Sequence, residues 1–318
     1  MGIKIFSHTD TDGICSAAIA LAKFSDAEIW FSRPIGFYAD IKEVEDNTEV
    51  IICDIALTEA HYSKIFQEMK RLKATYFDHH PLPLGISEKD VPAKMIYDLT
   101  VSTSELIYKH YQNELPFEYI QVALYGAIGD YCDLTPFVLE SFERWDKRGI
   151  YLQAGLIAQA LQEVGLDYNF RRKLTNQLKS LVLPSLIPEI VEKAVKSTER
   201  ESDIYNFVKD HVKLYKNFAA VVDVPHLTSK AAIYAITITD LNIGLAATKT
   251  KKGDSYDISV RRKHKCKVDL NKLLREISVK FDGSGGGHVN AVGARIPVKK
   301  FIPFLKDMDK YLSEIEIC

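Results

Sequence analysis

Histidine and aspartate residues gather in a few short segments of this chain, where they could bind divalent metal ions. The first segment contains His8, Asp10 and Asp12 at a spacing of two residues, followed by Gly13. Alternate side chains of an extended segment point the same way, so these three could project to one side. Gly13 then allows a tight turn into a helix. The structural alternative is that Asp12 caps this helix and Asp10 is a turn residue.

The segment Asp78-His79-His80 places two adjacent histidines behind an aspartate. Neighbouring side chains on extended backbone diverge, so one histidine could bind a metal while the other faces a substrate. Asp78 could accept a hydrogen bond from an imidazole N–H and so fix its tautomer. A pair of solvated loop histidines is the alternative.

Two further aspartates could complete a metal centre. Asp54 ends the apolar run 50–53, and Asp130 follows the glycine-containing segment 126–129, with Asp133 as a less favoured alternative. Strand-end aspartates also cap helices, so each is weak evidence alone. Together with the histidines, they are too many ligands for one ion and suit two ions that share a carboxylate. This shell of oxygen and imidazole ligands favours Mn²⁺, with Mg²⁺, Co²⁺ and Zn²⁺ as alternatives.

The first half of the chain alternates strand-like and helix-like patterns. The predicted strands are Ile3–Phe6, Glu28–Phe31, Glu49–Cys53, Ala74–Phe77 and Met95–Tyr97. The predicted helices are Ile14–Lys23, Glu59–Lys73, Ser104–Gln112 and Phe117–Ile128. This alternation predicts an α/β fold with a mainly parallel sheet covered on both faces. Ligands bind beyond the carboxyl ends of such strands, where Asp10, Asp54 and Asp78 directly follow predicted strands.

Residues from about 138 to 213 look mostly helical, and a second α/β pattern follows. Its predicted strands are Phe218–Val224, Ala231–Thr239, Ile243–Thr248, Ile258–Val260 and Ala294–Pro297. Its predicted helices are Leu270–Phe281 and Phe301–Ile315, with a glycine-rich turn after the first. We expect the domain boundary near residues 190–215.

The composition fits a soluble globular protein, with 47% hydrophobic and 26% charged residues in 318. We see no signal peptide and no apolar run of the roughly 20 residues that a membrane span needs. The five cysteines are scattered, without a Cys-x-x-Cys pair. This argues against a cysteine-based metal site and favours reduced thiols in a cytoplasmic protein.

The charge is uneven along the chain. Residues 217–318 carry 17 Lys and Arg against 11 Asp and Glu, whereas the first 216 residues carry 24 against 32. An acidic front and a basic rear would suit metal binding followed by polyanion binding, although an accident of surface composition explains the charges equally well.

Taken together, Ser7–Gly13, Asp54, Asp78-His79-His80 and Asp130 resemble the four motifs of the DHH phosphoesterase superfamily, in the branch of nanoRNases and RecJ-like phosphodiesterases. Gly283–His288 resembles the glycine-rich signature of the DHHA1 domain. The resemblance covers nearly the whole chain in the expected order. It implies a catalytic DHH domain at 1–190, a helical linker at 191–215, a smaller α/β DHHA1 domain at 216–318 and an active site in the cleft between the domains.

The resemblance also implies roles for single residues. One metal would be held by His8, Asp10 and Asp54. A second would be held by Asp12, Asp54, His79 and Asp130. Asp54 would thus bridge the two metals, Asp78 would orient an imidazole, and His80 would contact the scissile phosphate. Substrate phosphate would be bound by Arg261, Gly285, Gly286, Gly287 and His288.

For the expected DHHA1 domain, the residue types alone are weaker evidence of substrate binding than the motif resemblance. The glycines of Gly283–His288 could bring backbone N–H groups against an anion, or form a flexible turn. Arg261 begins a basic run that continues to Lys267, and a solvated strand edge is its alternative. Ser102–Glu105 resembles a small-hydroxyl stretch found between the third and fourth motifs of the superfamily. It mainly predicts a helix N-cap, with a phosphate contact as an additional option.

The predicted function is hydrolysis of short single-stranded oligonucleotides to mononucleotides by a two-metal phosphodiesterase, in which a bridging hydroxide attacks phosphorus in line. The modest basic charge of the rear domain argues against a processive grip on long strands. Alternatives are a RecJ-like single-strand exonuclease, a hydrolase of cyclic dinucleotides or of phosphoadenosine phosphate, an inorganic pyrophosphatase, and a non-catalytic subunit of a replication complex. We expect no membrane partner, and a homodimer is one option for the assembly.

Overall fold

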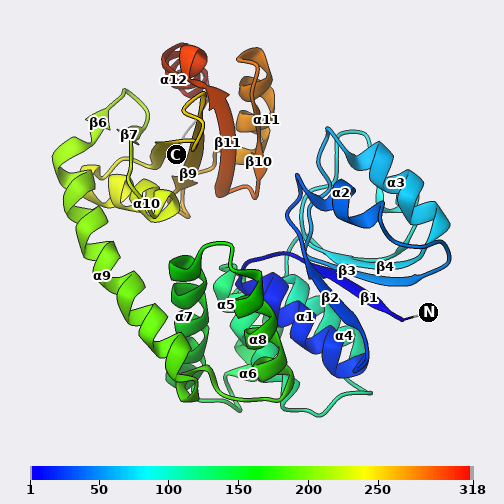
Figure 1. The fold of residues 1–318 in the computed structure, drawn as a ribbon. Helices are drawn as coiled ribbons and strands as arrows, with labels where there is room; N and C mark the ends of the chain where they lie inside the picture. The colour runs from blue at the N-terminus through cyan, green and yellow to red at the C-terminus, as the bar shows by residue number, and fades with distance from the viewer. Residues whose placement is uncertain (1, 316–318) are drawn as a thin grey trace. The chain divides into compact units, whose positions relative to one another are not determined.

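The structure, a computed structural model, describes residues 2–315 and divides the chain into two compact units, Met1–Ser197 and Thr198–Cys318. The division falls within one continuous helix, α9 (Pro188–His211), so the expected linker at 191–215 overlaps mostly with this helix (Figure 1). Across the described residues, none of the helices has the length and apolar character needed to cross a membrane. Cys318 lies outside the described residues.

A five-stranded parallel sheet forms the centre of the first unit, as the sequence predicts. Its order is β2-β1-β3-β4-β5. The strands are β1 (Lys4–Ser7), β2 (Glu28–Phe31), β3 (Glu49–Cys53), β4 (Lys73–Asp78) and β5 (Lys94–Tyr97). The helices are α1 (Thr11–Lys23), α2 (Phe37–Ile41), α3 (Tyr62–Arg71), α4 (Thr103–Tyr111), α5 (Tyr119–Gly129), α6 (Pro136–Ser141), α7 (Lys147–Val164) and α8 (Tyr168–Lys179).

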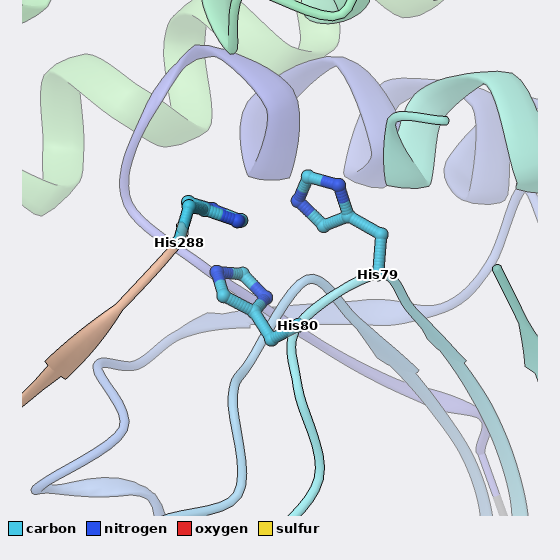
Figure 2. A group of neighbouring side chains, drawn as sticks. All are labelled: His79, His80 and His288. Carbon is cyan, nitrogen blue, oxygen red and sulfur yellow. The ribbon is translucent and has the colours of Figure 1, made fainter. Parts of the chain in front are cut away.

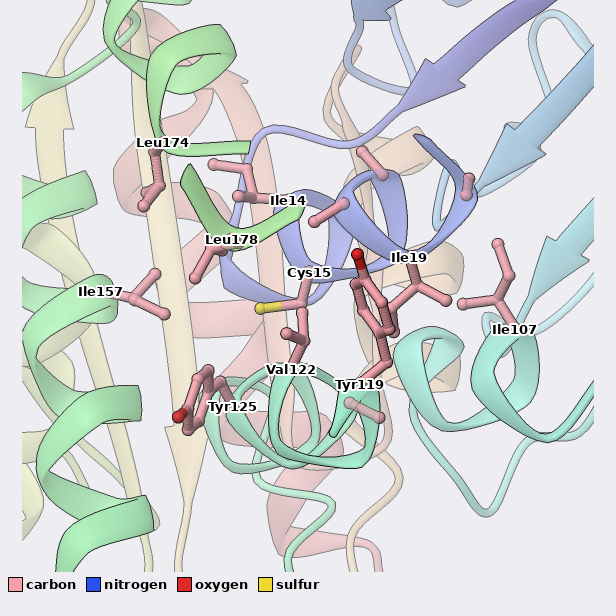
Figure 3. Close-up of a cluster of buried hydrophobic side chains, with 14 of the residues drawn as sticks. Ile14, Cys15, Ile19, Ile107, Tyr119, Val122, Tyr125, Ile157, Leu174 and Leu178 are labelled. Atoms are coloured by element: carbon pink, nitrogen blue, oxygen red, sulfur yellow. The ribbon is translucent and has the colours of Figure 1, made fainter. Parts of the chain in front are cut away.

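Successive residues of each strand point to opposite faces of this sheet, and each face has its own core. On β3, Ile51 joins the core formed with α1, α4 and α5, whereas Ile52 joins the core formed with α2 and α3. Helix α1 is buried over most of its length, because α4, α5, α7 and α8 surround it (Figure 3). Its small residues allow this close approach, so the loop preceding α1 is held firmly at the sheet edge.

The second unit contains a six-stranded mixed sheet of order β10-β11-β9-β8-β7-β6, in which only β7 and β8 pair in parallel among the described strands. The strands are β6 (Lys213–Leu214), β7 (Ala219–Val222), β8 (Ile243–Lys249), β9 (Ser255–Arg262), β10 (Ser284–Gly287) and β11 (Ala291–Pro297). The helices are α10 (Thr228–Thr239), α11 (Leu270–Lys280) and α12 (Val298–Ser313). Helices α11 and α12 cover one face, and α10 with the end of α9 covers the other.

Two predicted elements of this unit are wrong. The predicted strand Ala231–Thr239 is part of helix α10, because Ala231, Ala232, Ala235 and Ile236 form one buried helical face. The β-branched residues between them favour a strand by composition, but burial follows the helical period.

The predicted glycine-rich turn is largely strand β10, which lies between β11 and α11. A Cβ atom on Gly285 would lie 2.6 Å from Ser278 Oγ and 3.0 Å from the Leu274 carbonyl oxygen of α11. Glycine at this position therefore allows the helix to pack against the strand.

Candidate metal centre

The carboxyl ends of β1, β3 and β4 meet at one edge of the first sheet, and the predicted metal ligands follow these strands. Since β1, β3 and β4 are neighbours, the loops after them converge. Asp130 reaches the same place from the C-terminus of α5. The structure thus brings together all six predicted metal ligands, His8, Asp10, Asp12, Asp54, His79 and Asp130, in overlapping groups.

The first group consists of His8, Asp10 and Asp54, whose ligand atoms lie within 4.8 Å of one another. Asp10 caps α1, because its Oδ1 accepts a hydrogen bond from the Gly13 N–H at 3.0 Å. Its other oxygen accepts from His8 Nδ1 at 2.7 Å. The structural alternative assigned this cap to Asp12, which is wrong, because Asp10 is the residue that caps α1. Only one Asp10 oxygen serves the cap, and the second oxygen belongs to the cluster.

Asp54 lies at the centre of the cluster. Its side chain is 1% exposed, and its Oδ1 accepts a hydrogen bond from Thr103 Oγ1 at 3.1 Å. Its Oδ2 accepts no hydrogen bond from residues 2–315 and lies 3.7 Å from His8 Nδ1. The backbone of Asp54 has a φ of 62°, a left-handed conformation that aspartate tolerates better than most residues. A buried carboxylate oxygen without a donor suits a cation.

The second group forms around His79. Its Nε2 lies 3.3 Å from Asp54 Oδ1, 3.2 Å from Asp130 Oδ2 and 3.9 Å from Asp12 Oδ2. Asp54 therefore belongs to both groups, with Oδ2 toward His8 and Oδ1 toward His79. Three carboxylates and a histidine in a buried place are a donor set that fits a divalent ion.

Asp12 is anchored by a helix other than the one in which it lies. Its two oxygens accept hydrogen bonds from the backbone N–H groups of Thr103 at 2.7 Å and Ser104 at 3.0 Å, in the first turn of α4. Ser102 is the N-cap of α4, as predicted. The polar groups of this segment are buried and bind the carboxylates of Asp12 and Asp54. The phosphate contact expected of it stays a prediction.

The two adjacent histidines diverge, as predicted from extended backbone, with ring centroids 4.8 Å apart and an interplanar angle of 78° (Figure 2). His80 Nδ1 donates to Asp78 Oδ1 at 2.8 Å, and the Tyr76 hydroxyl lies 2.9 Å from Asp78 Oδ2. Asp78 is thus the orienting carboxylate of His80 and fixes a tautomer with the proton on Nδ1. This arrangement directs Nε2 away from Asp78.

Sequence reasoning does not identify two side chains near this cluster. Arg171 of α8 is 4% exposed, and its Nε donates to the Thr9 carbonyl oxygen at 2.8 Å, which fixes the loop between His8 and Asp10. Cys132 forms a third group with His79 and Asp130. No local pattern marks either residue, because Arg171 comes from a distant helix and Cys132 has no cysteine partner nearby in sequence. The less favoured Asp133 instead accepts a hydrogen bond from the Tyr151 hydroxyl at 2.5 Å.

The predicted phosphate-binding residues belong to the second unit. Arg261 lies near the end of β9, and its Nη2 donates to Ser229 Oγ at 2.6 Å, near the start of α10. His288 directly follows β10 (Figure 2). Its backbone forms reciprocal hydrogen bonds with that of Ala291. Gly287 has a φ of 146°, and a Cβ there would lie 2.7 Å from the Ala291 oxygen. Gly285 and Gly287 therefore have a structural role. The binding role of the glycines stays a prediction.

Two carboxyl groups of the metal-free cluster, those of Asp12 and Asp130, have pKa values raised toward or above neutral pH. Burial, together with the charge of Asp54, raises the pKa of Asp12 to about 8. Burial also raises the pKa of Asp130 to about 7, with His79 acting against the rise and Asp10 adding to it. A metal ion must displace these protons, so metal affinity and pH are linked.

We therefore expect the affinity for Mn²⁺ to rise with pH between about 6 and 9, measured by calorimetric titration in buffers of different ionisation enthalpy.

The stability of the metal-free protein should also depend on pH, because the carboxyls of Asp12 and Asp130 bind more protons in the folded protein than in the unfolded chain. Their contribution to stability is present at acidic pH and is lost as pH rises through the folded pKa values. The free energy of unfolding with chelator should fall from about pH 5 to pH 8. A flat profile in both measurements would contradict this view of the cluster.

Gly126 is needed because α5 packs closely against Asp12. A Cβ on Gly126 would lie 2.2 Å from Ser104 Oγ and 2.6 Å from Asp12 Oδ1. We expect Gly126→Ala to lower the free energy of unfolding by about 1–3 kcal/mol and to weaken metal binding. The matched control is Gly155→Ala in α7, where a Cβ meets nothing within 4 Å and the helix gains about 0.5–1 kcal/mol. Equal effects of the two substitutions in denaturant unfolding would contradict the packing argument.

Comparison with known proteins places these observations in a family. Residues 2–128 match the model for the DHH family, N-terminal domain, and residues 228–314 match the DHHA1 domain. Comparison with curated protein sequences gives no match.

Three solved structures illustrate the shared fold. The pGpG-specific phosphodiesterase PggH from Vibrio cholerae has 17% identity and a TM-score of 0.60, with 99% of both chains covered. The exonuclease RecJ bound to manganese has 14% identity and a TM-score of 0.63, with 99% of this chain and 91% of RecJ covered. A DHH domain from a protein described as a member of a family of ribosomal proteins has 15% identity and a TM-score of 0.72, with 99% and 87% covered.

The order of the two matched domains is the order that the motifs predict, and the four motifs of the first half meet at one sheet edge. The chain therefore belongs to the DHH/DHHA1 superfamily of phosphoesterases.

Proposed function

We propose that this protein is a phosphodiesterase dependent on divalent metal ions, which hydrolyses short oligonucleotides to mononucleotides. The observation that carries this proposal is the position of Asp54, which belongs to both the His8 group and the His79 group. One carboxylate between two ligand groups is the arrangement expected of a two-metal centre. We assign the metal chemistry to residues 1–190 and binding of the substrate to 216–318, connected by 191–215.

The two metal ions, which we propose to be Mn²⁺, would activate water and stabilise negative charge on the phosphoryl oxygens. The proposed ligands are those of the two groups: His8, Asp10 and Asp54, and Asp12, Asp54, His79 and Asp130. Burial of Asp12, Asp54 and His79 excludes competing water from these ligands. Asp78 holds the His80 ring so that its second nitrogen can donate to a phosphate or leaving oxygen.

Arg261, His288 and the backbone of Gly285, Gly286 and Gly287 are the proposed contacts for the terminal phosphate or nucleotide. The Arg261 guanidinium is fixed by Ser229, which would reduce the entropy lost when it binds phosphate.

The basic run after Arg261 offers little charge to a long strand, which supports a short substrate. The Arg262 guanidinium donates to backbone carbonyl groups, including that of Val289, and Lys263 pairs with Asp240. Both cations thus stabilise the unit itself. A long single strand would require a series of available cations and stacking aromatics. The similarity to PggH, named as specific for the dinucleotide pGpG, also supports a short substrate.

The test is a Mn²⁺-dependent assay that compares dinucleotides, five-mers, long single strands, cyclic dinucleotides and phosphoadenosine phosphate, with products separated by chromatography. We expect the dinucleotide and five-mer to give the highest kcat/KM and mononucleotide products. Arg261→Lys keeps the charge but loses bidentate geometry, so it should raise KM for the short substrates. Faster turnover of the long strand than of the dinucleotide would overturn the short-substrate assignment.

A single-strand exonuclease is the second candidate, because the fold is also that of RecJ. In that case the exposed Lys265 and Lys267 would contact the strand backbone. Their replacement by glutamine would then lower activity on long strands and reduce its salt dependence, while activity on dinucleotides stays unchanged.

A further inference from the structure

The segment that follows the metal ligand Asp130 carries a thiol back toward the cluster. Helix α5 ends in a turn in which the Cys132 N–H donates to the Ala127 oxygen at 2.8 Å and the Tyr131 N–H donates to the Ile128 oxygen at 3.2 Å. This pair of hydrogen bonds defines a Schellman motif, with Asp130 as the C-cap. The motif reverses the chain directly after Asp130, so the side chain two residues later returns to the helix end.

This turn is unusual because its left-handed position is occupied by tyrosine. Tyr131 has a φ of 59°, where glycine is the common residue, and its side chain is 76% exposed. A left-handed conformation costs a residue with a Cβ about 1–2 kcal/mol. Strained backbone of this kind concentrates at functional sites.

The turn positions Cys132, whose Sγ lies within 4.8 Å of ligand atoms of His79 and Asp130. Cys132 is a free cysteine of intermediate burial, whereas the other described cysteines are buried within cores. Thiolate, imidazole and carboxylate are together a donor set typical of Zn²⁺ and Co²⁺, and thiolate is a poor ligand for Mg²⁺.

We propose that Cys132 is an additional ligand at the His79 metal position and gives that position a preference for thiophilic divalent ions, Zn²⁺ and Co²⁺, over Mg²⁺. This inference rests on the proposed metal centre and adds a ligand to it. On binding, the Cys132 thiol loses its proton to solvent and its sulfur forms a bond to the metal ion. The lack of a Cys-x-x-Cys pair argues against a metal site built from several cysteines. It does not argue against a single cysteine that joins histidine and aspartate ligands.

Titration of the metal-free protein with Co²⁺, followed by absorption spectroscopy, tests this proposal. We expect a near-ultraviolet charge-transfer band from thiolate to Co²⁺ in the wild-type protein, and its loss in Cys132→Ser. The buried thiols of Cys15, Cys53 and Cys266 remain in this variant as an internal control. Tyr131→Gly should keep the band, since glycine favours the same turn.

Competition with a chromophoric chelator gives the second readout. Cys132→Ser should weaken Zn²⁺ binding at least about tenfold while Mg²⁺ binding stays unchanged, because serine keeps the shape but not the soft donor. If Co²⁺ binds with visible ligand-field bands but the wild-type protein gives no thiolate band, Cys132 is not a ligand, although the metal centre stands. If Co²⁺ does not bind at all, the proposed metal centre fails together with this inference.

Discussion

Replacing Asp54 by asparagine should lower Mn²⁺-dependent kcat by at least about a thousandfold. The loss of one shared carboxylate weakens both metal positions, and stabilisation by metal ions contributes several kcal/mol to a phosphoryl transition state. Asparagine keeps the volume of the side chain and tolerates the left-handed backbone at this position. The fold should therefore survive, and the far-UV circular dichroism of the variant should match that of the wild-type protein.

Asp133→Asn is the matched control for this substitution. Asp133 is the nearby aspartate that pairs with Tyr151 instead of joining the cluster. Its replacement should leave kcat within about threefold of the wild-type value, a difference of less than about 1 kcal/mol. Full activity of Asp54→Asn would contradict the assignment of Asp54 as the shared ligand.

Replacing His80 by asparagine should lower kcat about 10²–10⁴-fold without loss of bound metal, because positioned proton donors contribute this much to catalysis. His80 is held by Asp78 Oδ1 at 2.8 Å. Burial lowers the pKa of the imidazole, but the charge and hydrogen bond of Asp78, together with the charge of Asp54, raise this pKa above its ordinary value. A larger fraction of His80 is therefore protonated near neutral pH than of an ordinary histidine. A group that binds or protonates a phosphate oxygen must carry this proton. Activity should fall as pH rises through this pKa.

Asp78→Asn provides a graded comparison. An amide oxygen can still accept from the imidazole N–H but without the charge, so we expect a loss of about 10–100-fold in kcat and a lower pKa in the pH–rate profile. If His80→Asn instead released a metal ion, as measured by elemental analysis of the purified protein, His80 would be a metal ligand and its assigned contact with phosphate would be wrong.

Much of the first unit could be predicted because its strands are short, apolar and separated by helical periods. The positions of Asp10, Asp54 and Asp78 after β1, β3 and β4 follow from the general property that carboxyl ends of parallel strands share an edge. Asp130, predicted from its place at the end of an apolar, glycine-containing segment, reaches that edge from a helix. The sequence could not show that Asp12 is held by α4, because that contact joins residues that are 91 positions apart.

The errors have physical causes in tertiary packing. The segment Ala231–Thr239 contains β-branched residues typical of strands, but its alanines form a buried helical face against β8. Glycines at 284–287 predict a turn, whereas they form a strand whose lack of side chains accommodates α11. The proposed role of Cys132 could not be predicted, because the position of this residue depends on a left-handed Tyr131, which no local sequence preference predicts.

Asp54 is proposed to join two metal positions, and the most direct test is the number of Mn²⁺ ions bound per chain together with their magnetic coupling. Electron paramagnetic resonance of the loaded protein, combined with elemental analysis, measures both. We predict two Mn²⁺ ions per chain with an exchange-coupled spectrum, and loss of the coupling in Asp54→Asn. One ion per chain, or two ions that remain uncoupled in the wild-type protein, would contradict the account.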